Sequence, residues 1–316
     1  MNPPTGSLTI GVFGAGHFGR FHALKLRGAA RASLAGLHDP DPARAALVSG
    51  EAGCPALSAE ALLEASDAVI IATPTLSHAP LAERALRAGC HVFVEKPITA
   101  TLAEADALIS LAAAEKRVLM VGQIERHSAA MRTLRENLGG RRLMALEAAR
   151  VAPFRPRSLD VSVVLDLMIH DLDLILSLVP SPLVEVRAVG GSVMTDRPDW
   201  AVAQLRFANG AQAQVTASRV AVGLERKLRA LGPEGEMRVD FMARSLEFLA
   251  PDGGNAIESM PGWSLARRSW TDHDSLEAEQ SAFIAAILDG AAHEANGEQG
   301  RAALDAALRV EAALKG

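Results

Sequence analysis

Residues 8–22 constrain the fold more than any other part of the chain. They read LTIGVFGAGHFGRFH and place Gly14, Gly16 and Gly19 in the spacing G-x-G-x-x-G. This spacing is informative only between a strand and a helix, and here an apolar strand-like run precedes it and a helical pattern follows it. Gly14 permits a tight turn, Gly16 lets the backbone approach a pyrophosphate, and Gly19 lets the helix pack on the strand. The segment therefore predicts a unit that binds a dinucleotide, although a glycine turn can also serve packing alone.

Asp39 extends this prediction to the kind of dinucleotide. It ends a second strand-like run, RASLAGLHD, about 20 residues after Gly19. A carboxylate at this place accepts a hydrogen bond from a ribose 2′-hydroxyl and repels a 2′-phosphate, which favours NAD over NADP. Arg44 lies nearby and leaves NADP open as an alternative. We also expect His17 and Phe18 at the cofactor, because a helix N-terminus offers free N–H groups to phosphates.

Strand-like and helix-like segments alternate through residues 1–122. DAVIIATP is a continuous apolar run, as expected of a strand buried on both faces, and HVFVEKP and RVLMVG read as two further strands. LSHAPLAERALRAG reads as an amphipathic helix that Gly89 closes, and Thr101 and Glu104 form a capping box for the next helix. This alternation predicts an α/β Rossmann domain, a doubly wound parallel sheet with helices on both faces.

The pattern changes after Gly122. Strand-like runs follow one another between about Leu183 and Ala250, and the sequences ANG and GPEG between them indicate turns and antiparallel neighbours. Residues 251–270 are rich in Gly and Pro and are expected to form a loop, and two helices, about 272–289 and 297–315, end the chain. We therefore predict a second, α+β domain over residues 123–316.

Composition excludes several classes of protein. The chain has 316 residues, a net charge of -5, 49% hydrophobic residues and 22% charged residues, which fits a two-domain globular protein and not a nucleic-acid binder with a strongly basic surface. Cys54 and Cys90 form no CxxC pair, so we expect neither a disulfide scaffold nor a metal site. The apolar stretches are too short to span a membrane, and the N-terminus lacks the basic segment of a signal peptide. A cytoplasmic protein is expected.

The segment Leu165–Leu174, LDLMIHDLDL, places a histidine and three aspartates in an otherwise apolar helix. Burying a carboxylate costs free energy unless it is paired, so a structural or functional role must explain these groups. Asp166 and His170 are four residues apart and share one helical face, where the carboxylate can fix the imidazole tautomer and raise its basicity. A histidine tuned in this way can remove a hydroxyl proton near neutral pH. The alternative is a histidine that is satisfied within the core.

The other two aspartates of this segment point in different directions. Asp173 lies one turn beyond His170 on a similar face, where it can orient the histidine. Asp171 points about 100° away on an ideal helix and is expected to make a structural bond or a cap. Metal ligation by these three residues is disfavoured, because consecutive and alternate helix positions do not converge on one point.

Several segments together resemble the Gfo/Idh/MocA oxidoreductase family: GVFGAGHFGRFHA, IIATPTLSHAPLAERALRAGCHVFVEKPITATLAEADALI, LDLMIHDLDL and the C-terminal EQSAFIAAILDG and GRAALDAALRV. The resemblance covers nearly the whole chain. It implies a Rossmann domain followed by a domain built on a large, mainly antiparallel sheet. It also implies oxidation of a sugar or cyclitol hydroxyl with a nicotinamide cofactor, in an enzyme that is a homodimer or homotetramer.

Lys96 is the first residue to which the resemblance gives a role. It follows a parallel strand, at the sheet edge where open α/β folds keep their ligands, although a solvated surface lysine is the alternative. The family implies that this lysine touches the reacting hydroxyl and the nicotinamide, with Glu95 as a neighbour of the cofactor or the lysine. His170 is implied to be the acid/base, and Asp166 is implied to contact the substrate or support the histidine.

The turn after the strand IIATP is implied to lie against the cofactor, which here means Thr73 and Pro74. His78 opens the following helix. It is expected either to line the nicotinamide pocket or to be a surface histidine at a helix start.

Several arginines bear on the charge of the substrate. Arg126 follows the last parallel strand, and Arg150, Arg155 and Arg157 precede the helix of His170. Because arginine pairs with phosphate through two parallel hydrogen bonds, these residues predict an anionic or phosphorylated substrate, to which Asp173 is a further candidate contact. A salt bridge for Arg126 and a solvated loop for the others are the alternatives.

The segments IERH and DLMIHD resemble those of the branch of the family that includes UDP-N-acetylglucosamine 3-dehydrogenases. The best expectation is therefore oxidation of a nucleotide sugar, with no nucleic-acid or membrane partner. Three alternatives remain: a dehydrogenase of a neutral sugar or cyclitol such as inositol, a reductase of a carbonyl or imine, and a non-catalytic NAD(P)-binding regulator. The presence of both Lys96 and His170 argues against the regulator.

Overall fold

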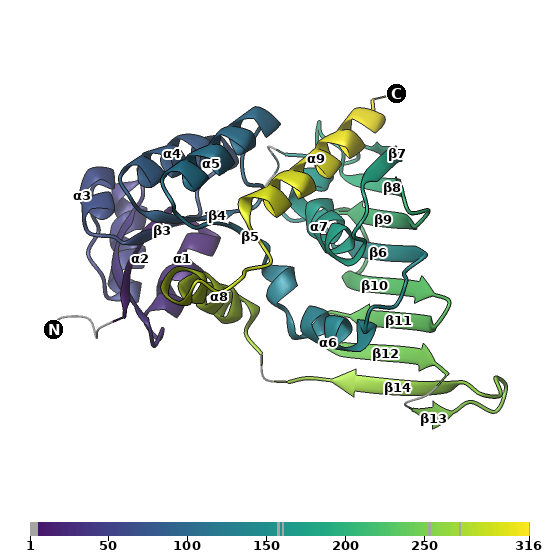
Figure 1. Ribbon diagram of the computed structural model, residues 1–316. Helices are drawn as coiled ribbons and strands as arrows, with labels where there is room; N and C mark the ends of the chain where they lie inside the picture. Colours follow the sequence, from purple (N-terminus) through teal and green to yellow (C-terminus); the bar gives the residue numbers. More distant parts are fainter. Residues whose placement is uncertain (1–5, 157–158, 160, 252–253, 272, 316) are drawn as a thin grey trace. The chain divides into compact units, whose positions relative to one another are not determined.

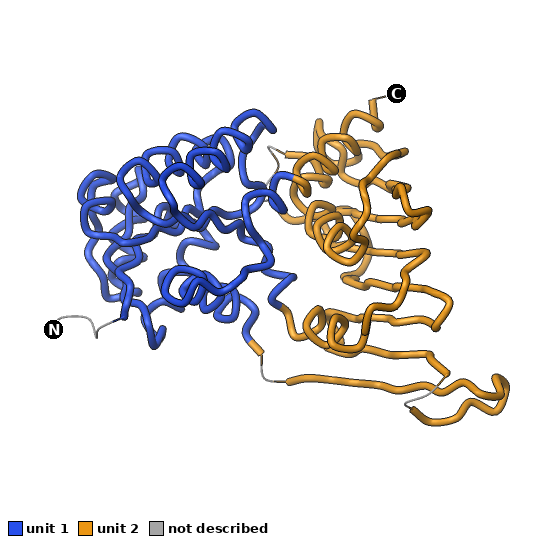
Figure 2. Tube along the Cα trace, viewed as in Figure 1, with its two compact units in different colours: residues 1–127, 274–301 blue, residues 128–273, 302–316 orange. Residues whose placement is uncertain are grey.

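The computed structural model describes residues 6–156, 159, 161–251, 254–271 and 273–315. The chain divides into two compact units (Figure 2). Unit 1 holds the residues up to His127 together with Asp274–Arg301, and unit 2 holds Ser128–His273 and the residues from Ala302 onwards.

Unit 1 is built on a five-stranded parallel sheet in the order β2-β1-β3-β4-β5 (Figure 1). The strands are β1 (Leu8–Phe13), β2 (Ala32–His38), β3 (Ala68–Ile71), β4 (His91–Glu95) and β5 (Leu119–Gly122). The middle strand, β3, is apolar throughout and every residue of it is buried, as expected for a sheet covered on both faces. The predicted doubly wound parallel sheet is confirmed.

The helices of unit 1 are α1 (His17–Leu26), α2 (Pro42–Ala52), α3 (Ala59–Glu64), α4 (His78–Arg87), α5 (Leu102–Ala114) and α8 (Ser275–Asp289), with short 3-10 turns at Thr75–Ser77 and Ile124–His127. The predicted capping box of α5 is present, because Thr101 and Glu104 exchange side-chain and backbone hydrogen bonds. Gly89 follows α4 with a φ of 83°, in the left-handed region that favours glycine.

The assignment of α8 to unit 1 differs from the expected division of the chain at Gly122. Phe283 of α8 is 0% exposed and its ring packs 5.7 Å from the ring of Phe93 in β4. At the surface of the same unit, Arg31 donates two hydrogen bonds of 2.7 Å to Asp289. Residues distant in sequence therefore complete the core of unit 1, a contact that the order of segments does not reveal.

Unit 2 contains a nine-stranded sheet in the order β13-β14-β12-β11-β10-β6-β9-β8-β7. Its strands are β6 (Ala145–Val151), β7 (Leu183–Gly191), β8 (Trp200–Phe207), β9 (Gln212–Ser218), β10 (Glu225–Gly232), β11 (Gly235–Asp240), β12 (Ser245–Ala250), β13 (Asn255–Ala256) and β14 (Ser264–Ser269). Strands β6 and β9 are parallel, and the other pairs are antiparallel. The predicted large, mainly antiparallel sheet is confirmed.

Strand β14 corrects the expectation of a loop over residues 251–270. It pairs with β12 from Ser245 opposite Ser269 to Ala250 opposite Ser264. Its sequence, SLARRS, has no apolar alternation, and Leu265 is 41% exposed. The strand forms because β12 offers its backbone edge, which a pattern of side chains does not indicate.

One face of this sheet is covered by helices (Figure 1). These are α6 (Ala129–Leu138), α7 (Ile169–Leu178) and the residues of α9 (Gly297–Ala313) from Ala302 onwards. Alternate strand residues such as Leu146, Val215 and Leu228 are buried against them, together with Leu172 and Ala307. The core of unit 2 therefore lies on this face.

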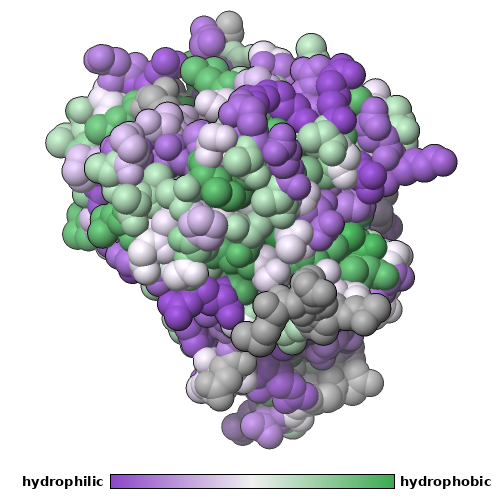
Figure 3. Space-filling view, turned by 90° about the vertical axis from the view of Figure 1, so that its left-hand side faces the viewer, coloured by the Kyte–Doolittle hydropathy of each residue, from purple (hydrophilic) through white to green (hydrophobic). Residues whose placement is uncertain are grey.

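The surface in Figure 3 shows hydrophilic and hydrophobic residues interspersed, which is usual for a globular protein. Within the described residues, none of the helices combines the length and the apolar character needed to cross a membrane.

Candidate functional site

The glycine turn of unit 1 fits its predicted task. Gly14 has a φ of 98°, and a Cβ there would lie 2.4 Å from the carbonyl oxygen of Ala72. A Cβ on Gly19 would lie 1.9 Å from the carbonyl oxygen of Gly14, so both positions need glycine for packing. A Cβ on Gly16 would meet nothing within 4 Å. Gly16 caps α1 without a side-chain hydrogen bond, so the N–H groups at this helix end face open space that suits the pyrophosphate of NAD.

His17 and Phe18 form the exposed first turn of α1. The His17 ring packs edge-on against Phe18 and Phe21, with centroids 5.6 and 4.8 Å apart. Phe18 is 37% exposed. Both predicted residues therefore lie at the surface beside the glycine turn.

Asp39 fastens the glycine turn to the end of β2. Its Oδ2 accepts a hydrogen bond of 2.7 Å from the backbone N–H of Ala15, and its Oδ1 accepts one of 2.9 Å from Asp41. Arg44 Nη1 lies 3.8 Å from Asp39 Oδ1. Because a carboxylate offers about four acceptor sites, Asp39 retains the capacity to bind a ribose hydroxyl.

Thr73 supplies a second sign of a ligand in unit 1. It follows β3, and its hydroxyl is buried without a hydrogen-bond partner among the residues that the structure describes. Buried polar atoms are rarely left unsatisfied, so this hydroxyl indicates a missing partner molecule. The Thr73 backbone nitrogen lies 3.2 Å from the place of a Cβ on Gly14, which puts the hydroxyl next to the glycine turn. Pro74, beside it, is exposed.

His78 joins the turns that follow β3 and β4. Its Nδ1 lies 2.8 Å from the carbonyl oxygen of Pro97, and its Nε2 lies 2.9 Å from that of Thr73. Burial lowers the pKa of His78, although the two carbonyl groups act in the opposite direction. At 1% exposure it is not the surface histidine that its place at a helix start suggested.

Glu95 and Lys96 end β4, and a buried pair of side chains fixes Glu95. Gln280 Nε2 donates to His22 Nδ1 at 3.0 Å and to the His22 carbonyl oxygen at 3.1 Å. His22 must therefore carry its proton on Nε2, from which it donates to Glu95 Oε1 at 2.8 Å. Lys96, directly after Glu95, is half-buried and is joined to Pro97 by a cis peptide. Sequence reasoning missed His22 and Gln280, because α1 and α8 are far apart in the chain.

Arg126 lies inside unit 1 and not at an open surface. It is 5% exposed and donates a hydrogen bond to the carbonyl oxygen of Glu294. This bond holds the segment before α9 against the turn after β5. The parallel strands thus gather the glycine turn, Asp39, Thr73 and Lys96 at one edge of the sheet, where α/β folds bind nucleotides.

In unit 2, the expected single helix around His170 has two parts. Val164–Met168 forms a π-helical turn that contains Asp166, and α7 follows from Ile169. Asp166 and His170 are both half-buried. Such π turns are rare and occur frequently at functional sites. No residue pattern in the sequence distinguishes this turn from an α-helix.

The start of this helix is fixed by Ser162. Its hydroxyl accepts hydrogen bonds from the backbone of Val164 at 3.2 Å and Leu165 at 3.4 Å. The same hydroxyl donates to Glu311 of α9 at 2.5 Å. The π turn is thereby tied to the C-terminal helix.

Asp171 makes the structural bond that its direction predicted. Its carboxylate accepts two hydrogen bonds from Arg150, of 2.9 and 3.1 Å, and the two residues are 1% and 3% exposed. Arg150, which we expected to face the substrate, is instead engaged in holding α7 to β6. Asp173 is also buried, at 1% exposure. Arg157 lies outside the described residues.

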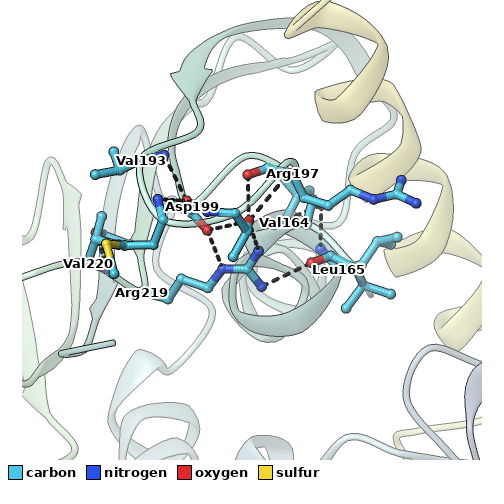
Figure 4. A network of polar contacts seen from close by, with 12 residues as sticks. Val164, Leu165, Val193, Arg197, Asp199, Arg219 and Val220 are labelled. Carbon is cyan, nitrogen blue, oxygen red and sulfur yellow. Dashed lines mark hydrogen bonds and ion pairs between the residues drawn. The ribbon is translucent and has the colours of Figure 1, made fainter. Parts of the chain in front are cut away.

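A second buried ion pair lies near the same helix (Figure 4). Arg219 donates through Nε to Asp199 at 2.8 Å and through Nη1 to the carbonyl oxygen of Val161 at 3.0 Å. Asp199 also accepts backbone hydrogen bonds from Val193 at 2.8 Å and Met194 at 2.6 Å. Arg219 therefore connects the loop before β8 with the chain just before the π turn.

Asp166 lines a pocket in unit 2 of about 230 Å³, together with Arg155, Arg219 and Arg226. Across the described part of the chain, no cluster of three or more His, Cys, Asp or Glu side chains is placed to hold a metal ion.

A doubly wound parallel sheet with this glycine turn, followed by a sheet domain with Asp166 and His170, defines a dinucleotide-dependent oxidoreductase. Two family profiles match the chain: "Oxidoreductase family, NAD-binding Rossmann fold" over residues 8–123, and "GFO/IDH/MocA C-terminal domain" over residues 143–238. The protein belongs to the Gfo/Idh/MocA family. The predicted family, and NAD as the cofactor, are confirmed.

Two relatives match the chain over almost its full length. The chain is 43% identical to UDP-N-acetylglucosamine 3-dehydrogenase of Acidithiobacillus ferrooxidans, over 98% of this chain and 97% of the relative. It is 31% identical to an inositol 2-dehydrogenase of Rhizobium meliloti, over 96% of both chains.

A solved structure of the A. ferrooxidans UDP-N-acetylglucosamine 3-dehydrogenase superposes with a TM-score of 0.93 at 41% identity, covering 98% of each chain. A structure described as "a putative myo-inositol dehydrogenase from Sinorhizobium meliloti 1021" gives a TM-score of 0.80 at 26% identity, with 98% of each chain covered.

Proposed function

We propose that this enzyme oxidises the C3 hydroxyl of UDP-N-acetylglucosamine with NAD. The observation that carries the proposal is the 43% identity, over 98% of the chain, to a UDP-N-acetylglucosamine 3-dehydrogenase. Identity at this level over both units makes a shared substrate the simplest expectation. The glycine turn, the unsatisfied Thr73 hydroxyl and the presence of both Lys96 and His170 support a catalytic protein and not a regulator.

In this proposal NAD, when bound, supplies the acceptor for the hydride that leaves C3. His170 removes the proton of the reacting hydroxyl, and Asp166 supports the imidazole from one turn earlier. Lys96 assists at the same hydroxyl through its ammonium group. Such acid–base groups contribute roughly 10²–10⁴-fold to rate. The same groups serve the reverse reduction.

The cofactor-binding residues of the proposal are Gly14, Gly16, Gly19, Asp39 and Thr73. The helix end at Gly16 takes the pyrophosphate, and Asp39 accepts a hydrogen bond from the ribose. His22 and Gln280 are positioning residues, because they act on Glu95 and through it on the turn of Lys96.

We further propose that the enzyme is a homo-oligomer that associates through the face of the unit 2 sheet opposite its helices. This face carries paired charges, such as Arg206 with Glu185 and Arg229 with Glu236, both at 2.8 Å. Trp200 adds a partly exposed aromatic ring at 37% exposure. A row of alternating charges can pair with its own copy across a two-fold axis. Molecular mass in solution, measured by light scattering, tests this.

The cytoplasm is the proposed location of the enzyme. Cys54 and Cys90 are free thiols, which fits a reducing compartment.

The substrate assignment is tested by measuring NADH formation with UDP-N-acetylglucosamine, N-acetylglucosamine and myo-inositol. We expect activity only with the nucleotide sugar. The alternative, a cyclitol dehydrogenase, is favoured by the 31% identity to an inositol 2-dehydrogenase. Activity with myo-inositol and none with the nucleotide sugar would establish that alternative.

A further inference from the structure

One end of the unit 2 sheet gathers arginines from three neighbouring strands. Arg150 lies near the end of β6, Arg226 pairs with it from β10, and Arg219 directly follows β9. Side chains two residues apart in a strand lie on the same face of the sheet. Arg150 and Arg226 therefore share the face of Ala148 and Leu228, which are buried at 5% and 1% exposure. The three guanidinium groups therefore lie on the side of the sheet that faces α7.

Two of these arginines, Arg150 and Arg219, are buried in ion pairs. Arg150 forms the bidentate pair with Asp171, and Arg219 binds Asp199 at 2.8 Å. All four of these residues are 4% exposed or less, so they serve the packing of α7 and of the loop before β8.

Arg226 differs from these two arginines because it is half-buried and faces the pocket of about 230 Å³. Arg155, on the chain after β6, is exposed and lines the same pocket. Its wall also contains Arg219, whose charge Asp199 offsets, and the carboxylate of Asp166. The other lining residues carry no charge, so the two guanidinium groups of Arg155 and Arg226 outnumber the one remaining carboxylate. The pocket therefore favours an anion next to the residue that is assigned to support His170.

The volume limits what this pocket can hold. Complete small-molecule sites measure roughly 300–1,000 Å³, so about 230 Å³ suits one part of a ligand. A phosphate or diphosphate is the part that guanidinium groups recognise, because its oxygens match their paired N–H donors.

We propose that this pocket is the subsite for the diphosphate of the nucleotide-sugar substrate, with Arg155 and Arg226 as the contacting residues. The inference rests on the proposed function, in which the substrate carries a diphosphate. Binding energy from this remote group orients the sugar at the reacting centre. Arg155 and Arg226 are then the residues that separate the nucleotide sugar from the free sugar.

Binding of UDP to the full-length enzyme tests the subsite without turnover. Titration calorimetry is performed with saturating NADH, so that the dinucleotide turn of unit 1 is not available to UDP. We expect Arg155→Gln and Arg226→Gln each to raise the Kd of UDP at least about tenfold, the loss of one charge-assisted hydrogen bond. Uridine, which has no phosphate, should bind weakly and equally to all variants.

Two further variants control for charge and for folding. Arg132→Gln removes one exposed guanidinium from α6 in the same unit and should leave the Kd of UDP unchanged. Arg226→Lys keeps the charge but loses the paired donors, so its Kd should lie between those of the wild type and Arg226→Gln. Because Arg155 is exposed, Arg155→Gln should unfold at the wild-type temperature.

Equal Kd values for UDP in the wild type, Arg155→Gln and Arg226→Gln would overturn the subsite, as would wild-type enzyme that does not bind UDP. Kinetics separate this failure from failure of the proposed function. If the wild type oxidises UDP-N-acetylglucosamine and Arg155→Gln and Arg226→Gln have the same KM for it, the subsite is refuted and the function stands. Arginine-dependent binding of UDP without oxidation of UDP-N-acetylglucosamine refutes the function and leaves the subsite standing.

Discussion

At the scale of single residues, buried polar pairs hold the functional segments in place. His22 donates to Glu95, and Gln280 fixes the tautomer that makes this possible. Asp171 and Asp199 bind the buried guanidinium groups of Arg150 and Arg219. Because breaking a buried charged pair leaves an uncompensated group, each of these contacts affects both stability and the geometry of the site.

His22→Leu is the first prediction at this scale. The substitution leaves the Glu95 carboxylate without its buried donor, so the free energy of unfolding should fall by about 1.5–3 kcal/mol. Urea unfolding measures this, with His17→Leu on the exposed side of α1 as the control. If the two variants unfold at the same urea concentration, the His22–Glu95 bond does not stabilise unit 1.

Asp199→Asn is the second prediction at the residue scale. Burial raises the pKa of Asp199, but hydrogen bonds from Val193 and Arg219 outweigh it and hold the pKa well below its usual range. The carboxylate therefore stabilises the fold above its unfolded pKa of about 4, and this contribution is lost as pH falls through the folded pKa. The substitution should cost about 3–5 kcal/mol at pH 7 and progressively less below about pH 4.

The matched control for this variant is Asp196→Asn, an exposed residue of the same loop, which should unfold like the wild type at every pH. A loss of stability in Asp199→Asn that is constant from neutral pH down to about pH 3 would contradict the assignment of the low pKa.

Residue directions could be predicted from the sequence where they follow from helix geometry alone. Asp171 points away from His170 and makes a structural bond, as its position indicated. The partner of that bond could not be predicted. Arg150 lies 21 residues away on β6, and only the packing of α7 against the sheet brings the two together. For this reason we expected Arg150 to face the substrate, whereas in the structure it is buried and paired with Asp171.

At the scale of elements, the strand–turn–helix unit of β1 and α1 carries the cofactor prediction. The spacing of Gly14, Gly16 and Gly19 was sufficient to infer the turn, because steric demands at Gly14 and Gly19 follow from the fold itself. The π turn at Val164–Met168 and strand β14 could not be inferred. The first depends on backbone hydrogen bonds that side-chain patterns do not encode, and the second on a free edge of β12.

Discrimination between the two dinucleotides is a prediction about this element. Asp39 accepts a hydrogen bond from Ala15 of the glycine turn, and we propose that its charge repels a 2′-phosphate. We expect tighter binding of NADH than of NADPH in fluorescence titrations. Asp39→Asn should reduce the difference between the two Kd values. NADPH binding as tight as that of NADH in the wild type would contradict the role of Asp39.

At the scale of the whole molecule, the chain returns to unit 1 after completing most of unit 2. Alternation of strands and helices was sufficient to predict the parallel sheet, and strand-like runs with turn signals indicated antiparallel strands, since both patterns are local. The large size of the second sheet was implied by the family resemblance. The assignment of α8 to unit 1 was not predictable, because an apolar helix face can pack against any hydrophobic core. Only the folded protein shows that Phe283 of α8 packs against Phe93 of unit 1.

Phe283→Ala tests this arrangement. The side chain is fully buried, so its loss should lower the free energy of unfolding by about 3–5 kcal/mol. Glu277→Ala, on the exposed side of the same helix, is the control and should change it little. Similar stabilities of the two variants would mean that α8 is not part of the core of unit 1.

The central claim is that the two units form an NAD-dependent dehydrogenase in which His170 is the base. The most direct test is kcat for oxidation of UDP-N-acetylglucosamine by the wild type and His170→Ala, with the Kd of NADH measured on the same samples. The predicted result is a decrease in kcat of roughly 10²–10⁴-fold with an unchanged Kd. A His170→Ala enzyme with nearly wild-type kcat would contradict the claim and make His170 a histidine of the core.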